Sequence, residues 1–161
     1  MKASYFSPDI REFIRLLAVH GVKYVIVGGE AVIYHGYARV SNNVDFFYEL
    51  SPENVRNLYQ ALEYYWAGDI PGIRSQEDLS IQGATIQFGD NPNMIVLYNS
   101  LTGVSFEEAW SARVEESIRV KGKKCPVYFI GLEQLIRNKR ALKRQKDRVD
   151  LKYLRAQLKK S

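Results

Sequence analysis

The stretch that most constrains the fold is VKYVIVGGEAVIYHGYARVSNNVDFFYEL, residues 22–50. It begins with a short apolar run rich in β-branched residues, which is typical of a buried strand. The glycine pair at 28–29 ends that strand, and residues 30–36 predict a two-turn helix. Residues 43–50 then alternate as a second strand does. Strands and a helix therefore follow one another closely and must pack together.

The rest of the chain continues this mixture of elements. Ser-Pro-Asp at 7–9 and Ser-Pro-Glu at 51–53 each predict a helix start, since they combine a cap, a proline and a favourable charge. Other elements are expected as strands at 84–89, 94–100, 116–120 and 126–131, a short helix at 105–110, and one or two helices over 132–159. Because the later strands are linked as hairpins, we expect an α+β fold, a mixed sheet flanked by helices with a C-terminal helical segment.

Charge divides the chain into two parts. Residues 119–161 hold 15 of the 23 Lys and Arg against three acids, a net charge of +12, whereas residues 1–118 carry −7. We expect one domain over residues 1–161, with residues 1–118 as its core and 119–161 as a basic hairpin and C-terminal helices. Such segregation favours attraction of phosphates, in a nucleotide or a nucleic acid, and a solvated basic tail is the alternative.

The expected location is the cytoplasm. Cys125 is the one cysteine, which excludes an internal disulfide and fits a reducing compartment. The first residues lack the apolar run of a signal peptide, and no stretch reaches the length of a membrane span. We therefore expect no membrane partner.

Two features indicate a phosphate site. Gly28 and Gly29 allow the backbone to approach a ligand, and the free amides at the start of the following helix can bind phosphate oxygens. The next strand carries Asp45, and alternation places residue 43 on the same face. Two carboxylates there would hold Mg²⁺ beside a triphosphate, but residue 43 is Asn43.

Residues 22–48 resemble the signature of the nucleotidyltransferase superfamily related to DNA polymerase β, in its small bacterial branch of abortive-infection and minimal nucleotidyltransferases. That branch reads as an apolar strand, G-G, x-A, H-G and then R-x-T-x-D-x-D. The matching residues are Gly28, Gly29, Ala31, His35, Gly36, Arg39 and Asp45, with Ser41 at the usual threonine. Residues 131–154 are similar to the K-x(4)-R-x-K-D segment of that branch, which places Lys139, Arg144, Lys146, Asp147 and Asp150 in it.

The resemblance implies transfer of NMP from an NTP to a hydroxyl acceptor, RNA or protein, with Mg²⁺ or Mn²⁺ as cofactor. Asp45 and Asn43 would occupy catalytic positions, with Asp45 as the metal ligand, and Val96 would stand at a third carboxylate position. The implied nucleotide-binding residues are Gly28, Gly29, Arg39, Ser41, Lys139 and Arg144.

With two of three carboxylates replaced, we expect the transfer to be weakened or lost. Glu30, Glu49 and Asp90 are the acids that would have to substitute. The rival interpretation is a pseudoenzyme without a metal cofactor that binds a nucleotide, RNA or a toxin or antitoxin partner. In a third, a second chain supplies the missing carboxylates.

Three placements can be checked in the structure. Gly28, Gly29, Asp45 and Lys139 should converge on one cleft, although they lie far apart in the sequence. Val96 should lie beside Asp45 and point to the position of the third carboxylate. Asp147 and Asp150 are expected to pair along the helices with Lys143, Arg144 or Lys146, at a few tenths of a kcal/mol each.

Overall fold

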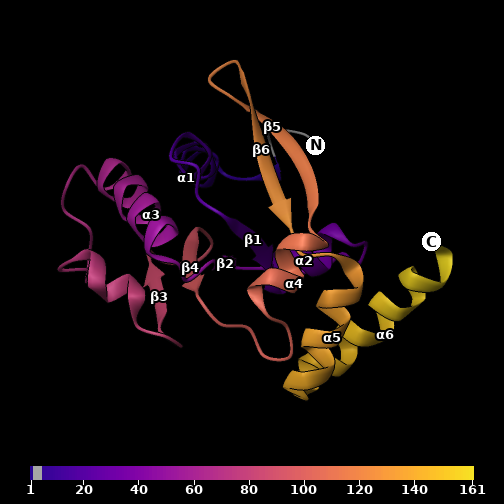
Figure 1. The fold of residues 1–161 in the computed structure, drawn as a ribbon. Coiled ribbons are helices and arrows are strands. Elements are labelled where there is room, and N and C mark those ends of the chain that lie inside the picture. Colours follow the sequence, from indigo (N-terminus) through magenta and orange to yellow (C-terminus); the bar gives the residue numbers. More distant parts are fainter. Residues whose placement is uncertain (2–4) are drawn as a thin grey trace.

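The protein is built on a six-stranded mixed sheet, seen in a computed structural model that describes residues 1 and 5–161 (Figure 1). The strands are β1 (Tyr24–Val27), β2 (Asn43–Tyr48), β3 (Thr85–Phe88), β4 (Met94–Tyr98), β5 (Val114–Val120) and β6 (Lys123–Phe129). Their order across the sheet is β3-β4-β2-β1-β6-β5. The pairs β2–β4 and β1–β6 are parallel and the other three are antiparallel, which confirms the expected mixed sheet.

The helices lie on both faces of this sheet (Figure 1). They are α1 (Pro8–Val19), α2 (Gly28–Tyr34), α3 (Pro52–Tyr65), α4 (Phe106–Ser111), α5 (Leu132–Leu142) and α6 (Gln145–Lys160), with a 3₁₀ turn, η2, at Gln76–Ser80. Alternate residues of β1 enter two separate cores. Tyr24 and Ile26 pack in the core with α1 and α3, while Val25 and Val27 pack in the core with α2, α4, α5 and α6. The domain therefore has three layers, with β1 and β2 at its centre.

Local sequence signals explain several element ends. Ser7 and Ser51 accept hydrogen bonds from the backbone N–H groups of Ile10 and Asn54, and so cap α1 and α3. The C-terminal helical segment is split in two, because Lys143 adopts a left-handed conformation with φ of 59° between α5 and α6. After this break, Arg144 and Lys146 at the start of α6 lie close to the strand residues Asp45 and Val96.

Helix α2 starts earlier than the sequence indicated. We expected it to begin after the glycine pair, but Gly28 is already its first residue. Gly28 has φ of +66°, a conformation that only glycine adopts readily, so the chain passes from β1 into α2 without a loop. Within the described part of the chain, every helix is too short or too polar to cross a membrane.

Candidate functional site

All eight residues that the sequence indicated as site residues line one cleft of about 350 Å³. They are Gly28, Gly29, Arg39, Ser41, Asn43, Asp45, Lys139 and Arg144. They come from the start of α2, the loop before β2, β2 itself, and the α5–α6 region, so the predicted convergence is observed. Lys146, Val96, Gln87 and Tyr98 complete much of the wall.

Asp45 lies at the centre of the cleft. Its carboxylate packs so closely on Gly28 that a Cβ there would overlap Asp45 Oδ2, and Asn43 Nδ2 donates a hydrogen bond to Asp45 Oδ1. Burial raises the pKa of Asp45 from 3.8 to about 6, although the Asn43 hydrogen bond and the charges of Lys139, Lys146 and Arg144 act in the opposite direction. Asp45 is the one carboxylate among the described residues that line the cleft.

The neighbouring strand places Val96 directly beside Asp45. The two residues are register partners in the parallel pair of β2 and β4, and Val96 lines the same cleft while only 2% exposed. This is the position that we predicted for Val96. It presents an isopropyl group, which cannot bind a metal ion, at the position where the resemblance implies a third carboxylate.

Two of the three acids that were candidates to replace the missing carboxylates lie away from Asp45. The third, Glu30, does not line the cleft, but it lies near Asp45, since burial and then the charge of Asp45 raise its pKa. Glu49 faces a different hollow with Lys23 and Glu53, and its Oε1 accepts a hydrogen bond from Ser51. Asp90 does not line the cleft. Over the part of the chain that the structure describes, no group of three or more His, Cys, Asp or Glu side chains is arranged to hold a metal ion. The donor set around Asp45 therefore does not fit a pair of Mg²⁺ ions.

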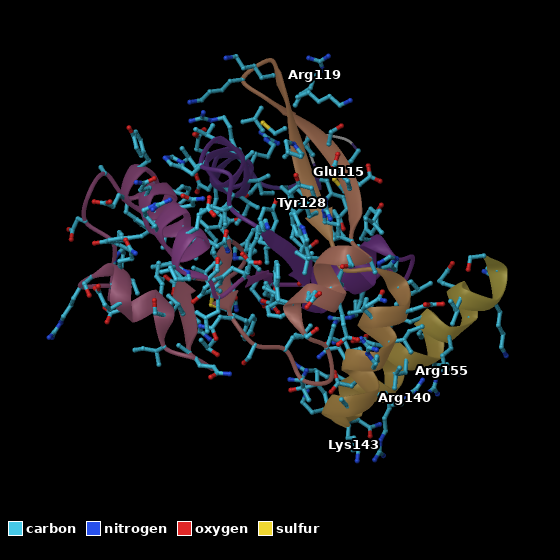
Figure 2. All side chains as sticks on the ribbon, in the orientation of Figure 1. Glu115, Arg119, Tyr128, Arg140, Lys143 and Arg155 are labelled. Atoms are coloured by element: carbon cyan, nitrogen blue, oxygen red, sulfur yellow. The ribbon has the colours of Figure 1, made fainter. Side chains whose placement is uncertain are left out.

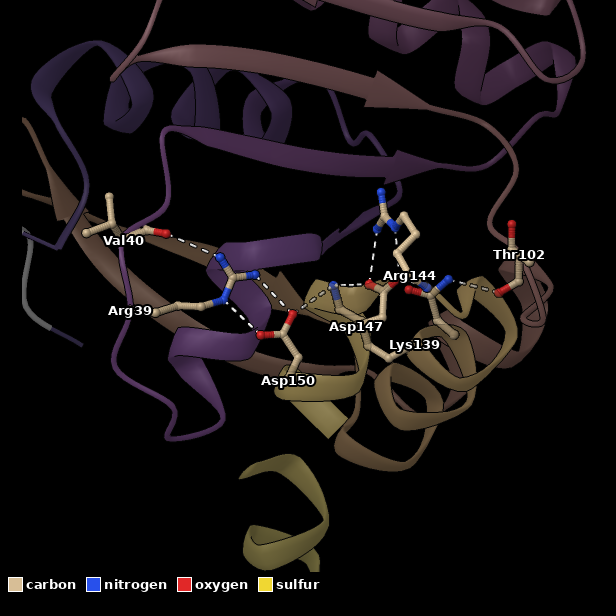
Figure 3. Close-up of polar contacts among 8 residues, drawn as sticks. Arg39, Val40, Thr102, Lys139, Arg144, Asp147 and Asp150 are labelled. Carbon is tan, nitrogen blue, oxygen red and sulfur yellow. Dashed lines mark hydrogen bonds and ion pairs between the residues drawn. The ribbon is translucent and has the colours of Figure 1, made fainter. Parts of the chain in front are cut away.

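A buried ion network borders the cleft (Figure 3). Lys139 Nζ lies 3.3 Å from Asp147 Oδ1 and 3.2 Å from Asp150 Oδ2. Arg39 Nε lies 3.0 Å from Asp150 Oδ1, and Arg144 Nε lies 2.7 Å from Asp147 Oδ2. Lys139, Asp147 and Asp150 are all at most 3% exposed. The network fixes three cations at one edge of the cleft.

This network corrects the expectation for Asp147 and Asp150. Of the expected partners, only Arg144 pairs with Asp147, and the others are Lys139 of α5 and Arg39 from before β2. The acids are buried and not on the helix surface. Burial opposes ionisation of Asp147, but hydrogen bonds from Arg144 and Lys139 hold its pKa below the usual value. Asp147 thus stays charged and orients both cations.

The charge of the cleft follows from the positions of these side chains. Four basic side chains, those of Arg39, Lys139, Arg144 and Lys146, border a space that contains the Asp45 carboxylate alone. The two buried aspartates lie behind the cations and offset part of their charge. The cleft therefore suits an anion with several negative charges.

Most of the basic segment lies elsewhere. Of the basic residues in 119–161, Lys139, Arg144 and Lys146 line the cleft. Figure 2 shows Arg140, Lys143 and Arg155 on the outer side of the C-terminal helices and Arg119 near the tip of the β5–β6 hairpin. Charge segregation in the sequence therefore does not indicate which cations face the cleft.

Ser41 and His35 have structural contacts. Ser41 Oγ donates a hydrogen bond to the Asn43 carbonyl at 3.0 Å. A Cβ on Gly29 would lie 2.8 Å from Ser41 Oγ. His35 Nε2 is 2.7 Å from the Ile130 carbonyl, which ties the end of α2 to the segment after β6. Burial lowers the pKa of His35, so the ring is neutral near pH 7. The contact of His35 with the Ile130 carbonyl is thus a structural reason for a histidine at this position of the signature.

A larger hollow of about 510 Å³ lies where α1 and α3 end, lined by His20, Gln60, Glu63, Tyr64 and Ala67. It brings together no Lys or Arg side chain. His20 Nδ1 contacts the Leu16 carbonyl at 2.9 Å, which is a helix-end contact. We therefore take the cationic cleft as the candidate functional site, although it is the smaller of the two.

Sequence reasoning missed several residues around Asp45. Tyr98 and Asn138 both border the space next to it. Tyr98 follows Val96 by two residues on β4, so strand alternation would have placed it on the same face. Asn138 precedes Lys139 and is buried, and no motif singled it out.

Residues 8–157 match the family described as "Nucleotidyltransferase of unknown function (DUF6036)". No curated protein matches the chain significantly.

Proposed function

The chain belongs to this family of nucleotidyltransferases of unknown function, and we propose that its cleft binds the triphosphate of an NTP while metal-dependent NMP transfer is severely weakened or lost. Within the superfamily we assign it to the small bacterial abortive-infection and minimal branch, with a degenerate metal motif. The resemblance of residues 22–48 and 131–154 to that branch supports the assignment.

Binding of the triphosphate is supported by the charge of the cleft. Arg39, Lys139 and Arg144 are held by the buried aspartates, so little side-chain entropy remains to be lost when they meet phosphate oxygens. Lys146 is exposed, lines the cleft and adds a fourth positive charge to it. Arginine forms bidentate hydrogen bonds to phosphate, which adds orientation to affinity.

The observation that carries the second half of the proposal is the pairing of Asp45 with Val96. In nucleotidyl transfer a hydroxyl oxygen attacks the α-phosphorus of the NTP, and pyrophosphate leaves. Negative charge must therefore be stabilised on the attacking oxygen and on the pyrophosphate oxygen whose bond to the α-phosphorus breaks. Asp45 alone can orient or deprotonate one hydroxyl. Val96 and the Asn43 amide supply no further negative charge with which to hold cations there.

The test is to measure NTP binding and NTP transfer separately. Calorimetry with each of the four NTPs in EDTA should show binding, and a labelled-NTP assay with RNA and protein acceptors in Mg²⁺ should show little or no transfer. Arg144→Gln should weaken binding about tenfold, because it removes one charge-assisted contact. Arg140→Gln, the same change on the outer side of α5, should leave binding unchanged. Efficient NMP transfer by the unaltered protein would refute the second part of the proposal, that transfer is severely weakened or lost.

RNA binding is a second candidate function, favoured by one feature of α6. Arg148, Lys152, Arg155 and Lys159 are exposed and recur at helical spacing on one face, and none forms an ion pair with a described residue. A protein that binds RNA through this face should lose affinity steeply as salt rises. Measured binding that is independent of salt would remove this candidate.

A further inference from the structure

The β5–β6 hairpin projects from one end of the sheet (Figure 1). Strand β6 pairs with β1 where Ile26 is opposite Phe129, the last residue of β6, so most of the hairpin extends beyond β1. Every residue of β5 is opposite one residue of β6, so the hairpin contains no bulge. Strand β5 is therefore a regular edge of the sheet, seven residues long.

The outer edge of β5 lacks the features that usually prevent an edge strand from pairing with another chain. Those features are short length, bulges, proline and lysine. The opposite edge strand, β3, has four residues, and β6 carries Lys123, Lys124 and Pro126. Strand β5, with the sequence VEESIRV, contains no proline, glycine or lysine. Among the described residues no strand pairs with this edge, so its outward N–H and C=O groups can bind a further strand.

The exposed face of β5 carries charges of both signs. Ile118 is buried in the core with α1, so alternation places Glu115, Ser117 and Arg119 on the opposite face. Glu115 and Arg119 are exposed, and neither forms an ion pair with a described residue (Figure 2). Arg119 Nη1 donates to the Gly122 carbonyl at 3.1 Å, a contact within the hairpin turn. The two charges lie on either side of Ser117 at equal spacing.

An antiparallel pairing of β5 with β5 of a second copy, centred on Ser117, matches these charges. It places Glu115 of each copy opposite Arg119 of the other, so two equivalent ion pairs form about a two-fold axis. Centring the pairing one residue earlier would set two glutamates opposite each other, and like charges repel. Centring it one residue later would set each Arg119 opposite a serine. The sequence of β5 thus favours one register with itself.

The core-facing side of β5 accommodates the same register. There Val114 would lie opposite Val120, which is an apolar pair. Glu116 would lie opposite Ile118, but its carboxylate already has partners within its own copy. It accepts a hydrogen bond from the Tyr34 hydroxyl at 2.7 Å and lies 3.8 Å from the amino group of the chain. Neither face therefore sets an unpartnered charge against the second copy.

We propose that β5 is a self-association surface, through which two copies of this chain pair antiparallel about Ser117 and join their sheets into one. Such an interface is isologous, since the same strand serves both copies. Backbone hydrogen bonds along β5 supply affinity, and the Glu115–Arg119 pairs fix the register. No residue of β5 lines the cationic cleft, so the association is independent of the proposed function.

Sedimentation velocity over a concentration series tests this pairing, and the unaltered protein should form a species with twice the mass of one chain. Glu115→Arg sets arginine opposite arginine, and Arg119→Glu sets glutamate opposite glutamate. Each variant alone should therefore dimerise at least about tenfold more weakly. An equal mixture of the two variants restores both ion pairs between unlike copies, so it should dimerise about as tightly as the unaltered protein. This recovery also requires that both variants are folded.

Glu107→Arg is the matched control, because it makes the same charge change at an exposed position on α4. It should leave the dimer unchanged. The proposal is overturned if the unaltered protein sediments as a monomer at every concentration, or if either β5 variant alone dimerises as the unaltered protein does. It is also overturned if both variants lose the dimer and their mixture does not regain it.

Discussion

Asp45 of β2 and Val96 of β4 are register partners on adjacent parallel strands, and both line the cationic cleft. An aspartate at position 96 would bring a second carboxylate next to the first. The valine instead leaves Asp45 flanked by an apolar side chain and by the Asn43 amide, which donates to it. Two strand positions, 43 and 96, thus separate a site that could bind cations from a site with a single, partly buried acid.

Asp45→Asn should stabilise the metal-free protein near neutral pH. The folded-state pKa of Asp45, about 6, lies above its ordinary value of 3.8, so ionisation costs stability as pH rises between these values, and the full cost is present above about 6. The gain should be about 3 kcal/mol at about pH 7.5 and near zero at about pH 3.5. Urea unfolding in EDTA at both pH values measures it, with Asp90→Asn as the exposed control. An equal change in the free energy of unfolding at both pH values would contradict the raised pKa of Asp45.

Lys139→Met should destabilise the fold strongly. The change leaves Asp147 and Asp150 buried with one cation fewer, and breaking a buried ion pair costs about 3–5 kcal/mol. Arg144 and Arg39 still contact the two acids, so we expect the lower part of that range. Arg140→Met, one residue along and exposed, should change the free energy of unfolding by less than about 0.5 kcal/mol. Similar effects for the two variants would show that the network contributes little.

Asp147 should contribute stability that acid removes. Its folded-state pKa is held below 3.8, so this contribution is present above that ordinary value and is lost as pH falls through the folded-state pKa. The difference in unfolding free energy between the unaltered protein and Asp147→Asn should therefore shrink below about pH 3.8. Urea unfolding across an acid pH series gives the difference directly. A difference that is constant with pH would mean that the charge of Asp147 is not what stabilises the fold.

Gly28→Ala should cost more than the backbone conformation alone explains. Both Gly28 and Gly68 have positive φ, but a Cβ on Gly68 would meet nothing within 4 Å, whereas one on Gly28 would overlap the Asp45 carboxylate. Gly68→Ala therefore measures the backbone strain, about 1 kcal/mol, and Gly28→Ala should exceed it by about 1–3 kcal/mol. Adding Asp45→Ala to Gly28→Ala should remove most of the excess. An excess that persists in the double variant would place the clash elsewhere.

Local signals in the sequence predicted most of the fold. Caps at Ser7 and Ser51, the β-branched run before Gly28 and the alternation after Asn43 all depend on neighbouring residues, and the structure confirms those elements. The mixed sheet was also predicted correctly. The glycine pair was predicted to precede the helix, because a glycine pair usually marks a turn, whereas Gly28 with its positive φ is already the first helical residue.

The positions of the site residues were predictable, but the contacts behind them were not. Strand alternation and the resemblance placed Asp45, Val96 and Lys139 at one cleft. The pairing of Arg39 with Asp150 joins residues 111 positions apart, and no local pattern indicates it. Burial of Asp147 and Asp150 likewise depends on the α5–α6 break at Lys143, which brings Lys139 over both acids.

Restoring the carboxylates tests the account of the cleft most broadly. Asn43→Asp/Val96→Asp places three acids together, so the variant should be less stable than the unaltered protein in EDTA, since like charges repel. Either single change should restore much less metal binding, because carboxylates that share cations act as a unit. Glu49→Asp, an acid change outside the cleft, serves as the control.

The most direct measurement is the melting temperature of the unaltered protein and of Asn43→Asp/Val96→Asp, each with and without Mn²⁺. At a Mn²⁺ concentration about 100 times Kd, binding to the folded form adds about 2.7 kcal/mol, a rise of about 5–10 °C for a domain of this size. We predict that rise in the double variant and little change in the unaltered protein. A large Mn²⁺-dependent rise in the unaltered protein, accompanied by NTP turnover, would contradict the account.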